Sequence, residues 1–598
     1  MRPPCPWRPA SHTLPAMDAG KILPALAWMR TYPRSSLPRD LFAGLVLTAI
    51  LVPAGMGYAE ASGLPAIVGL YATIVPLLAY AALGPSRILV LGPDSALLPL
   101  IAAVVVPLSA GSQDRAVALS ALLAVVVGVV IIAAGVARLG FLTDLLSAPV
   151  RQGYLNGIAL IVLVSQLPRL FGFSTAAATG LFDELSAFVA GVRDGETNTV
   201  SLAIGLACLI VILGLRAIRP EIPGILIAVV GATVVSGAFD LAATSSITVV
   251  GPLPVGLPPV TLPPLNVADL FAVVPAALGI ALVAATDTSV LSRTFAARRG
   301  DEVDPDREFI ALGGANLATG LLSGMPISSS ASRTPVAEAA GARTQLTGVV
   351  GAALIALMLI VAPGLLASLP TSALAAVVIV AALSLVDIGA MVRLWRLRTT
   401  EFWLAMISFL GVALIGVIPG VFLAVAVSLL EFIRRAWRPH DAVLGRADGV
   451  KGYHDLTYYP DARQVPGLVL YRFDAPLFFA NADVFRERLR ARIAEADDPV
   501  RWVVISAEPI TDVDTTAATM LDELLDELEG EDITLAFAAL KDPIRAKLHR
   551  YGAIGRIPDE RIFPTIGTAV TGYLKATGQA WTDWEEGVHP TQSPDAPH

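Results

Sequence analysis

Charged residues are scarce in this 598-residue chain, at 15% of the composition, whereas ordinary soluble domains carry about 25%. Lysine is absent between Lys21 and Lys451, so every basic residue in that long interval is an arginine. The sequence holds no basic patch of the kind that binds nucleic acid. We therefore expect no nucleic-acid partner.

Cysteine and histidine are rare as well. Cys5 and Cys208 are too few and too far apart in the sequence to indicate a disulfide framework or a metal cluster. The histidines all lie outside the apolar region, which removes histidine as a proton carrier or metal ligand inside a membrane. The sequence also lacks a nucleophile–base pair and a phosphate-binding loop. We predict that the protein is not an enzyme and needs no organic cofactor.

Hydrophobic residues, in contrast, make up 55% of the chain, and the mean hydropathy is +0.69. Several uncharged runs, such as residues 116–135 and 347–366, reach the roughly 20 residues that a helix needs to cross a bilayer. A dozen such runs cannot share one soluble core. We predict a polytopic α-helical protein of the cell (inner or plasma) membrane, with about fourteen segments between Leu41 and Arg434.

Arginines alternate along the predicted loops. Short loops rich in Arg or Lys stay in the cytoplasm, and every second loop of this chain holds most of the arginines. These residues are Arg87, Arg138, Arg151, Arg216, Arg219, Arg293, Arg298, Arg299, Arg343, Arg393, Arg396 and Arg398. The pattern predicts that both termini are cytoplasmic.

The tetrapeptide Asp-Leu-Phe-Ala occurs twice, at residues 40–43 and 269–272, each time at the head of a set of seven predicted segments. Because seven is odd, the two sets must have opposite orientations, which is the inverted-repeat plan of many secondary transporters. We place the repeats at about residues 38–240 and 267–436, within a transmembrane domain at residues 38–438. A partly disordered, cytoplasmic N-terminal segment precedes it at residues 1–37.

Each set contains one interrupted segment. These are Leu-Gly-Pro-Asp-Ser-Ala-Leu at residues 91–97 and Gly-Met-Pro-Ile-Ser-Ser-Ser at residues 324–330. Proline lacks an N–H donor, so a continuous helix is not expected at either place, and the small polar residues that follow favour the start of a new half-helix. In a membrane, broken backbone survives only where it is buried in protein or lines a wet cavity. Paired interruptions therefore predict a binding site at the midplane.

Two half-helices that meet at their N-termini direct free N–H groups and positive dipole ends at one point, which favours an anion. Arg333, which we expect one turn into the second half-helix, adds a full positive charge, although it could instead form a structural ion pair. The serines suit helix packing equally well, and Asp94 would repel an anion unless it were protonated or paired, so capping is its alternative role. The predicted substrate site comprises Gly92, Pro93, Asp94, Ser95, Ala96, Ser329, Ser330, Ala331, Ser332 and Arg333.

Asp287, which is followed by Thr288, is the other notable charge inside the membrane region. A buried carboxylate with neighbouring hydroxyl groups can bind Na⁺ or carry a proton, and either ion can drive an anion uphill. A salt bridge to Arg333 is its structural alternative. We predict Asp287 and Thr288 as coupling-ion residues, with Ser329 and Ser330 as further ligands if the ion is Na⁺. No other metal is expected.

The residues that carry these features resemble the SulP family of anion transporters, which includes sulfate permeases, bicarbonate transporters and prestin-like proteins. The matching stretches are DLFAGLVLTAILVPAGMGYAEASGLPAIVGLY (residues 40–71), LGPDSAL (91–97), DREFIALGGANLATGLLSGMP (306–326) and SRTPVAEAAGARTQLTG (332–348). The resemblance implies seven-plus-seven inverted repeats, a core domain that moves against a gate domain, and usually a homodimer. It also implies that substrate binds between the third and tenth segments, here residues 92–96 and 329–333.

In relatives that use Na⁺, an acidic residue of the eighth segment is a ligand, and Asp287 occupies that position here. The chain departs from the family at one point. Members commonly have a glutamine directly after the first-segment proline, where this chain has Ala54 after Pro53. The departure removes a polar contact near the substrate.

After Arg438 the chain changes character. Residues 468–473, 502–506 and 533–538 read as strands, and residues 483–495 and 515–529 read as amphipathic helices, which indicates a small α/β domain. It resembles a STAS domain, expected at residues 439–578 in the cytoplasm, with a disordered tail at 579–598. In related anti-sigma-factor antagonists a serine or threonine at the position of Thr515 can be phosphorylated. The alternative role of Thr515 is a helix N-cap.

These features predict a secondary active transporter of a small inorganic or carboxylate anion, and the family resemblance implies sulfate as the default substrate. It would work by alternating access, with H⁺ or Na⁺ coupling or by anion exchange. Na⁺-coupled bicarbonate transport and dicarboxylate transport are alternatives. An alternative from another class is an uncoupled anion channel or voltage-responsive motor, whose currents would not depend on Na⁺ or proton gradients. Arg333 disfavours a transporter of neutral bases, and an anion sensor without transport has no positive support.

Overall fold

The computed structural model describes residues 29, 32–140, 147–175, 180–219, 222–261, 266–330, 332–553, 555 and 557–583. The chain divides into two compact units, Met1–Leu429 and Leu430–His598. Most of the predicted N-terminal segment and residues 584–598 of the predicted tail lie outside the described residues.

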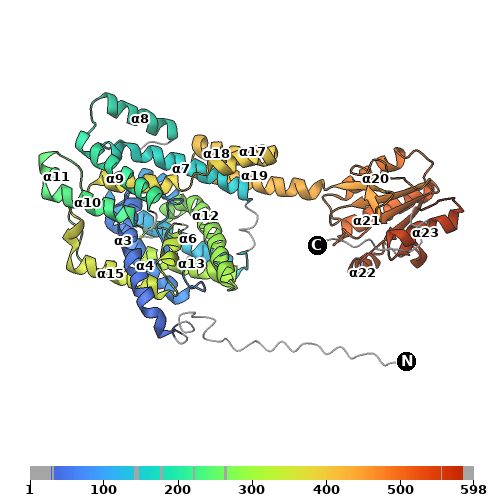
Figure 1. Cartoon of the computed structure of the whole chain (residues 1–598), viewed down its shortest axis with the longest axis horizontal. Helices are drawn as coiled ribbons and strands as arrows, with labels where there is room; N and C mark the ends of the chain where they lie inside the picture. Colours follow the sequence, from blue (N-terminus) through green and yellow to red (C-terminus); the bar gives the residue numbers. More distant parts are fainter. Residues whose placement is uncertain are drawn as a thin grey trace. The chain divides into compact units, whose positions relative to one another are not determined.

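Within its described residues, the membrane unit is helical apart from two short strands. Figure 1 shows how the helices are arranged. The segments of the first half are α3 (Leu37–Ala61), α4 (Ala66–Leu83), β1 (Leu91–Gly92) with α5 (Leu98–Ser109), α6 (Gln113–Val136), α7 (Ala148–Leu170), α9 (Thr199–Ile218) and α10 (Gly224–Ala238). Those of the second half are α12 (Val267–Arg299), α13 (Pro305–Leu321), β2 (Ser328–Ser329) with α14 (Arg333–Ala339), α15 (Leu346–Val361), α16 (Thr371–Leu383), α18 (Thr399–Leu410) and α19 (Val417–Trp437). Each half therefore contains seven segments with the third one broken, which confirms the predicted repeat.

Two further helices occupy matching places in the halves. α8 (Leu181–Arg193) follows the fifth segment of the first half, and α17 (Ile388–Leu397) follows the fifth segment of the second half. Among the described residues, eight helices are long and apolar enough to cross a membrane. α5, α10, α15 and the α18 region are apolar but shorter.

The helices pack as two groups. α3, α4, α6, α12, α13 and α15 pack on one another, and we call them the core group. α7, α9, α16 and α18 pack together in the same way, with α10 on α9, and form the gate group. Close packing within the core group depends on small residues. A Cβ at Gly128 of α6 would lie 2.7 Å from the carbonyl oxygen of Gly313 in α13, so neither helix could keep its place with a larger residue there.

The C-terminal unit contains a six-stranded sheet in the order β4-β3-β5-β6-β7-β8. The strands are β3 (Asp441–Arg446), β4 (Tyr453–Asp455), β5 (Leu468–Phe473), β6 (Trp502–Ser506), β7 (Thr534–Ala538) and β8 (Ile562–Phe563). β5 to β8 are parallel, and β3 is antiparallel to both of its neighbours. The helices are α20 (Ala482–Ala494), α21 (Thr515–Gly530), α22 (Asp542–Tyr551) and α23 (Ile566–Thr577). The predicted strands and helices of this α/β domain are confirmed.

The ordered part of this domain is longer than the predicted boundary at residue 578. Trp581 packs against the hydrophobic cluster on the α23 face of the sheet. Asp583 accepts a hydrogen bond from the buried Arg446 at 2.9 Å. Trp581 and Asp583, which the prediction assigned to a disordered tail, therefore contact this domain, and Asp583 supplies the counter-charge that the buried Arg446 needs.

Candidate anion site

The two strands of the membrane unit cross and form the frame of the predicted site. They pair antiparallel, with Leu91 opposite Ser329. The N–H of Ser330 donates to the carbonyl of Val90 at 3.1 Å, and the N–H of Val90 donates to the hydroxyl of Thr334 at 3.1 Å. The non-helical backbone thus finds its hydrogen bonds within the protein, which is the condition for keeping it inside a membrane.

Two buried amide side chains hold the strands from outside. Asn316 of α13 accepts from the N–H of Ile327 at 2.9 Å and donates to the carbonyl of the same residue at 3.1 Å. Gln345 donates to the carbonyls of Ser86 and Leu89 at 2.8 and 3.1 Å. Neither residue was predicted from the sequence as part of the site. The sequence does contain a signal for them, because an amide side chain buried in an apolar segment costs free energy unless it has a hydrogen-bond partner.

Arg333 is the first residue of α14, not one turn into it as we expected. Its side chain is 2% exposed and crosses to the first repeat, where Nη2 donates to the carbonyl of Pro93 and lies 3.9 Å from Oδ2 of Asp94. Its Cζ is 5.9 Å from the ring centre of Tyr58 in α3. Gly92 leaves room for this arrangement, because a Cβ there would lie 3.0 Å from Nη1. The two interrupted segments therefore meet around one guanidinium group.

This group retains unused donors. Within the described part of the chain, Nε and Nη1 of Arg333 and Oγ of Ser329 are buried without a hydrogen-bond partner. A buried donor that lacks a partner costs about 1–3 kcal/mol, and more when it is charged. An oxyanion offers acceptors only, so it complements this set of donors. The alternative structural ion pair of Arg333 is also present, with Asp94 and not with Asp287.

The predicted capping residues act differently from expectation. The N-cap residues of α5 and α14 are Leu97 and Ser332, and neither makes a side-chain capping bond. Instead, Oδ1 of Asp94 accepts from the N–H of Ala96 at 3.0 Å, and Oγ of Ser330 accepts from the first N–H of α14 at 3.3 Å. Asp94 thus combines its local backbone role with the ion pair.

The remaining predicted residues lie close by. The hydroxyls of Ser330 and Ser332 are 3.2 Å apart. Ser95 is buried, and Ser328, which we had not included, donates to the carbonyl of Ala284 in α12 at 3.3 Å. Ala331 lies outside the described residues.

Asp287 lies on α12 and belongs to the same charge cluster. Its carboxylate interacts electrostatically with Asp94 and with Arg151 of α7, a helix of the gate group. Tyr154, one turn further along α7, interacts with Asp287, and its buried hydroxyl has no hydrogen-bond partner among the described residues. Asp287 thus connects the anion site with the gate group.

Oxygen atoms for a cation are also present in this region. Oγ1 of Thr288 is buried and, within the described residues, has no hydrogen-bond partner. With the carboxylate of Asp287 and the hydroxyl of Ser329, it offers the all-oxygen donor type that hard cations prefer. The described residues contain no group of three or more His, Cys, Asp or Glu side chains that could hold a metal ion.

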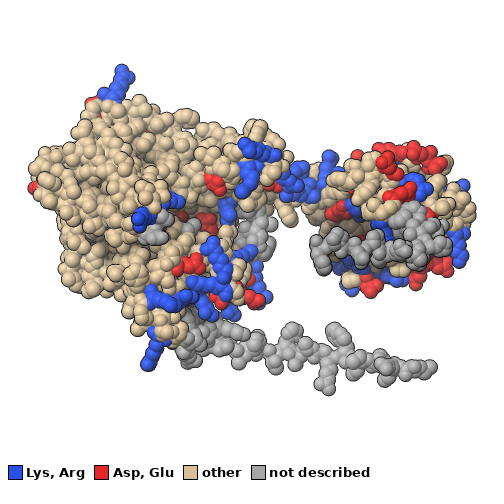
Figure 2. All heavy atoms as spheres, in the orientation of Figure 1, with Lys and Arg blue, Asp and Glu red and all other residues tan. Residues whose placement is uncertain are grey.

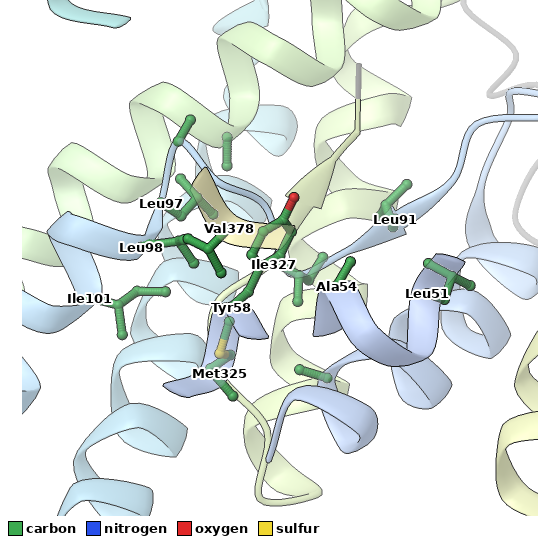
Figure 3. Close-up of a cluster of buried hydrophobic side chains, with 14 of the residues drawn as sticks. Leu51, Ala54, Tyr58, Leu91, Leu97, Leu98, Ile101, Met325, Ile327 and Val378 are labelled. Atoms are coloured by element: carbon green, nitrogen blue, oxygen red, sulfur yellow. The ribbon is translucent and has the colours of Figure 1, made fainter. Parts of the chain in front are cut away.

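An apolar shell surrounds the crossing (Figure 3). Ala54 and Tyr58 of α3 lie beside Ile327, which precedes β2, and Val378 of α16 closes the same region. Ala54 is 3% exposed, so its methyl group makes this wall apolar where the resemblance suggested a glutamine. Because such surroundings screen charge less than water does, Arg333 attracts an anion more strongly here than an exposed arginine would.

Thr515 of the C-terminal unit is exposed and opens α21. The N-cap is Asp514, whose carboxylate accepts from the N–H of Ala517 at 2.8 Å, so the N-cap alternative for Thr515 is wrong. Nearby, a hydrogen bond from Lys547 lowers the pKa of Asp512. The hydroxyl of Thr515 is therefore available on the surface next to a fixed set of charges.

The membrane unit has two inverted halves, and the third segment of each half is broken. The positively charged side chain of Arg333 is buried where the broken segments meet, and this arrangement defines an inverted-repeat membrane transporter of anions. Comparison with known proteins identifies the group. Residues 37–408 match the family model "Sulfate permease family", and residues 459–569 match "STAS domain". The chain belongs to the sulfate permease family.

Named relatives and solved structures agree with this assignment. The chain is 42% identical over 562 residues to a "Probable sulfate transporter" of Mycobacterium tuberculosis, covering 94% of this chain and 100% of that protein. It is 30% identical over 567 residues to "Sulfate transporter 4.1, chloroplastic" of Arabidopsis thaliana, covering 92% and 82%. Its fold resembles the murine anion transporter Slc26a9 in the inward-facing state, with a TM-score of 0.85, 24% identity and coverage of 94% and 95%.

Proposed function

We propose that this protein is a secondary active transporter of sulfate that works by alternating access and couples the anion to a proton or Na⁺. The observation that carries the proposal is the buried guanidinium of Arg333, which joins the two interrupted segments and has two nitrogen donors without a partner among the described residues. The names of the relatives from Mycobacterium tuberculosis and Arabidopsis thaliana support sulfate as the substrate.

The charges around Arg333 favour coupled transport over an uncoupled channel. An anion that enters next to Asp94 and Asp287 meets two carboxylates, and the buried Arg333 is already paired with one of them, Asp94. Like charges in apolar surroundings repel strongly. A proton or Na⁺ taken up at Asp287 removes part of this repulsion, so the cation and the anion each favour binding of the other.

The same residues connect binding with movement. Arg333, Asp94 and Asp287 lie on segments that pack in or against the core group, whereas Arg151 and Tyr154 lie on α7 of the gate group. A change of charge at Asp287 alters its attraction to Arg151 across the boundary between the groups. This boundary is where the core is proposed to slide against the gate.

Uptake into proteoliposomes tests the substrate and the site. Initial uptake of labelled sulfate, bicarbonate and succinate is measured for wild type, Arg333→Ala and the control Arg216→Ala, which removes an exposed arginine at the end of α9. We expect sulfate to be preferred and Arg333→Ala to lower its uptake about a hundredfold, since a buried charged donor is lost. Wild-type uptake by the folded Arg333→Ala protein would show that the site is elsewhere.

Imposed gradients test the coupling. Sulfate accumulation is followed with an inward proton gradient, an inward Na⁺ gradient or neither, in wild type and Asp287→Asn. We expect one gradient to drive accumulation in wild type, and the variant to lose accumulation while it retains sulfate–sulfate exchange. Conductive sulfate flux that ignores both gradients would favour the uncoupled channel.

Further parts of the proposal concern arrangement in the cell membrane. We place both termini in the cytoplasm because of the arginine pattern, take the protein to be a homodimer because of its family, and take Thr515 as a candidate modification site because it is exposed. Protease access to terminal tags in right-side-out and inverted vesicles tests the orientation. Cross-linking in vesicles tests the dimer, and phosphopeptide mapping tests Thr515.

A further inference from the structure

α17 is amphipathic and contains no buried residue. Its ten residues span about 15 Å, half the thickness of a hydrocarbon core, so it cannot cross the membrane. Large apolar side chains are exposed on one side of the helix, with Ile388 at 68%, Val392 at 44% and Trp395 at 52%. Leu397, the last residue of the helix, is 74% exposed and lies on the opposite side. A short helix of this kind in a membrane protein lies in the interface between lipid tails and water.

The other side of α17 is basic. Arg393 and Arg396 are exposed and three residues apart, so they lie on one face of the helix. Arg398 follows directly and is 3.0 Å from Glu401, so its charge is already partly compensated. Figure 2 shows Lys and Arg side chains gathered over the region that Figure 1 labels α17 and α18.

Aromatic residues complete the surface. The ring of Trp395 lies 4.9 Å from that of Phe402 and 6.4 Å from that of Trp403, in edge-to-face arrangements. Trp403 is itself 54% exposed. Tryptophans concentrate at the headgroup level of membranes because the ring is apolar and the N–H is polar. The exposed tryptophan rings therefore favour a position for α17 at the membrane–water interface.

α8, in the matching place of the first half, provides an internal comparison. It also exposes apolar residues, with Phe182 at 68% and Val189 at 56%. Its first turn carries Asp183 and Glu184, and Arg193 is its only basic residue. Both helices suit a membrane surface, but only α17 has the charge that attracts anionic lipid.

We propose that the α17 surface, made of Arg393, Trp395, Arg396 and Trp403, binds the phosphodiester headgroups of anionic membrane lipids. The planar guanidinium groups of the two arginines suit the phosphate oxygens, and the tryptophans hold the glycerol region. A zwitterionic lipid has the same phosphate but carries a compensating amine, so it binds more weakly.

The lipid contact also reaches the transport machinery. The N–H of Asp387, at the start of α17, donates to Oδ1 of Asn156 in α7 at 3.1 Å, and Gln152 donates to the same oxygen at 3.1 Å. α7 also carries Arg151, which interacts electrostatically with Asp287. A lipid that fixes α17 therefore restrains α7. We infer that the rate of transport depends on anionic lipid, and this dependence rests on the proposed transport function, whereas the lipid binding does not.

Native mass spectrometry of the full-length protein tests the binding. The protein is presented with equal amounts of phosphatidylglycerol and phosphatidylcholine, and the ratio of retained lipids is measured. Each arginine near the surface contributes enough that Arg393→Gln/Arg396→Gln should lower the preference for phosphatidylglycerol roughly tenfold to thirtyfold. The control Arg216→Gln/Arg219→Gln removes two exposed arginines at the end of α9 and should keep it.

Equal retention of the two lipids by wild type would overturn the proposal, as would an equal loss in the two double variants. Loss of a dimer in the Arg393→Gln/Arg396→Gln variant, with no change in the ratio of retained lipids, would also overturn it. That result would mean that this surface joins two copies of the chain instead of binding lipid. All substituted side chains are exposed, and gel filtration confirms that each variant is folded.

Sulfate uptake in vesicles with and without phosphatidylglycerol tests the regulation. We expect severalfold faster uptake with the anionic lipid in wild type. Asn156→Ala should keep the lipid preference in mass spectrometry but lose the lipid dependence of uptake. Uptake that is equal in both vesicles would overturn the regulatory link alone. Absence of sulfate uptake in every vesicle would instead count against the proposed function, and the binding result would stand.

Discussion

The two repeats of the membrane unit build one crossing from different chemistry. The first repeat supplies Gly92, the carbonyl of Pro93 and the carboxylate of Asp94, whereas the second supplies the hydroxyl of Ser329 and the guanidinium of Arg333. The two repeats share one topology, but the first contributes a carboxylate and backbone groups to the crossing, and the second contributes a hydroxyl and a positive charge. The scaffold of such a transporter can be symmetric while its binding chemistry resides mainly in one half.

The paired Asp-Leu-Phe-Ala motifs show the same contrast. Asp40 is fully buried, and it accepts hydrogen bonds from the N–H groups of Arg343 and Thr344 and from the hydroxyls of Thr344, Thr347 and Tyr32. Asp269 makes one ion pair with the half-exposed Arg115 at 3.1 Å. Each aspartate opens its own half and contacts the region where the fourth segment of the other half begins. Each half therefore contacts the other through its motif aspartate, but Asp40 makes more hydrogen bonds than Asp269.

Substitutions at the opposed residues Gly92 and Ser328 should give the largest difference between the halves. Gly92→Ala places a methyl group about 3 Å from Nη1 of Arg333 and must displace the guanidinium, so we expect sulfate uptake to fall tenfold or more. Ser328→Ala removes one 3.3 Å hydrogen bond to Ala284 and should leave uptake within about twofold. Proteoliposome uptake compares the two variants. Equal effects would mean that the position of Arg333 is not critical.

The two motif aspartates should differ in stability. Asp40→Ala leaves several buried donors without a partner, and we expect the free energy of unfolding to fall by about 3 kcal/mol or more. Asp269→Ala removes a partly exposed ion pair and should cost no more than about 1 kcal/mol. Chemical unfolding of both variants in mixed micelles measures the difference. A larger loss for Asp269→Ala would contradict this expected order.

Much of this arrangement could be predicted from sequence. Hydropathy, the two motifs and the proline breaks near Pro93 and Pro326 were sufficient for the fourteen segments and the crossing, because helix length and proline chemistry are local properties. The exact start of α14 at Arg333 was not predictable, because it depends on strand pairing between residues some 240 positions apart. For the same reason the sequence offered Asp287 as the structural partner of Arg333, whereas the structure pairs Arg333 with Asp94.

The buried amides Asn316 and Gln345 were missed for a related reason. Each lies in a stretch that sequence analysis recognised, but its partners, Ile327 for one and Ser86 with Leu89 for the other, come from non-helical backbone whose path only the fold defines. In the C-terminal unit, by contrast, strand and helix periodicity predicted β5, β6, β7, α20 and α21 to within about a residue, whereas β3, β4, β8, α22 and α23 were not predicted.

Substitution of these two amides gives a third comparison between the halves, in which the free energy of unfolding is measured. Asn316→Leu leaves the N–H and carbonyl of Ile327 unpaired beside β2, and we expect a loss of about 2 kcal/mol in stability. Gln345→Leu leaves only carbonyl oxygens unpaired near β1, which is less costly, so about 1 kcal/mol is expected. Unfolding in mixed micelles ranks the two. The reverse order would show that the first repeat's strand is the more dependent on its support.

The last prediction concerns the C-terminal unit, which lies outside the two membrane repeats, and compares two neighbouring residues at the start of α21. Asp514→Ala removes the N-cap bond of α21 and the bond that Asp514 accepts from the N–H of Phe479, and we expect a loss of about 1 kcal/mol. Thr515→Ala should change stability by less than about 0.5 kcal/mol, because the side chain is exposed. Hydrogen exchange of α21 in the full-length protein distinguishes them. Faster exchange in Thr515→Ala than in Asp514→Ala would return the capping role to Thr515 and count against its availability for modification.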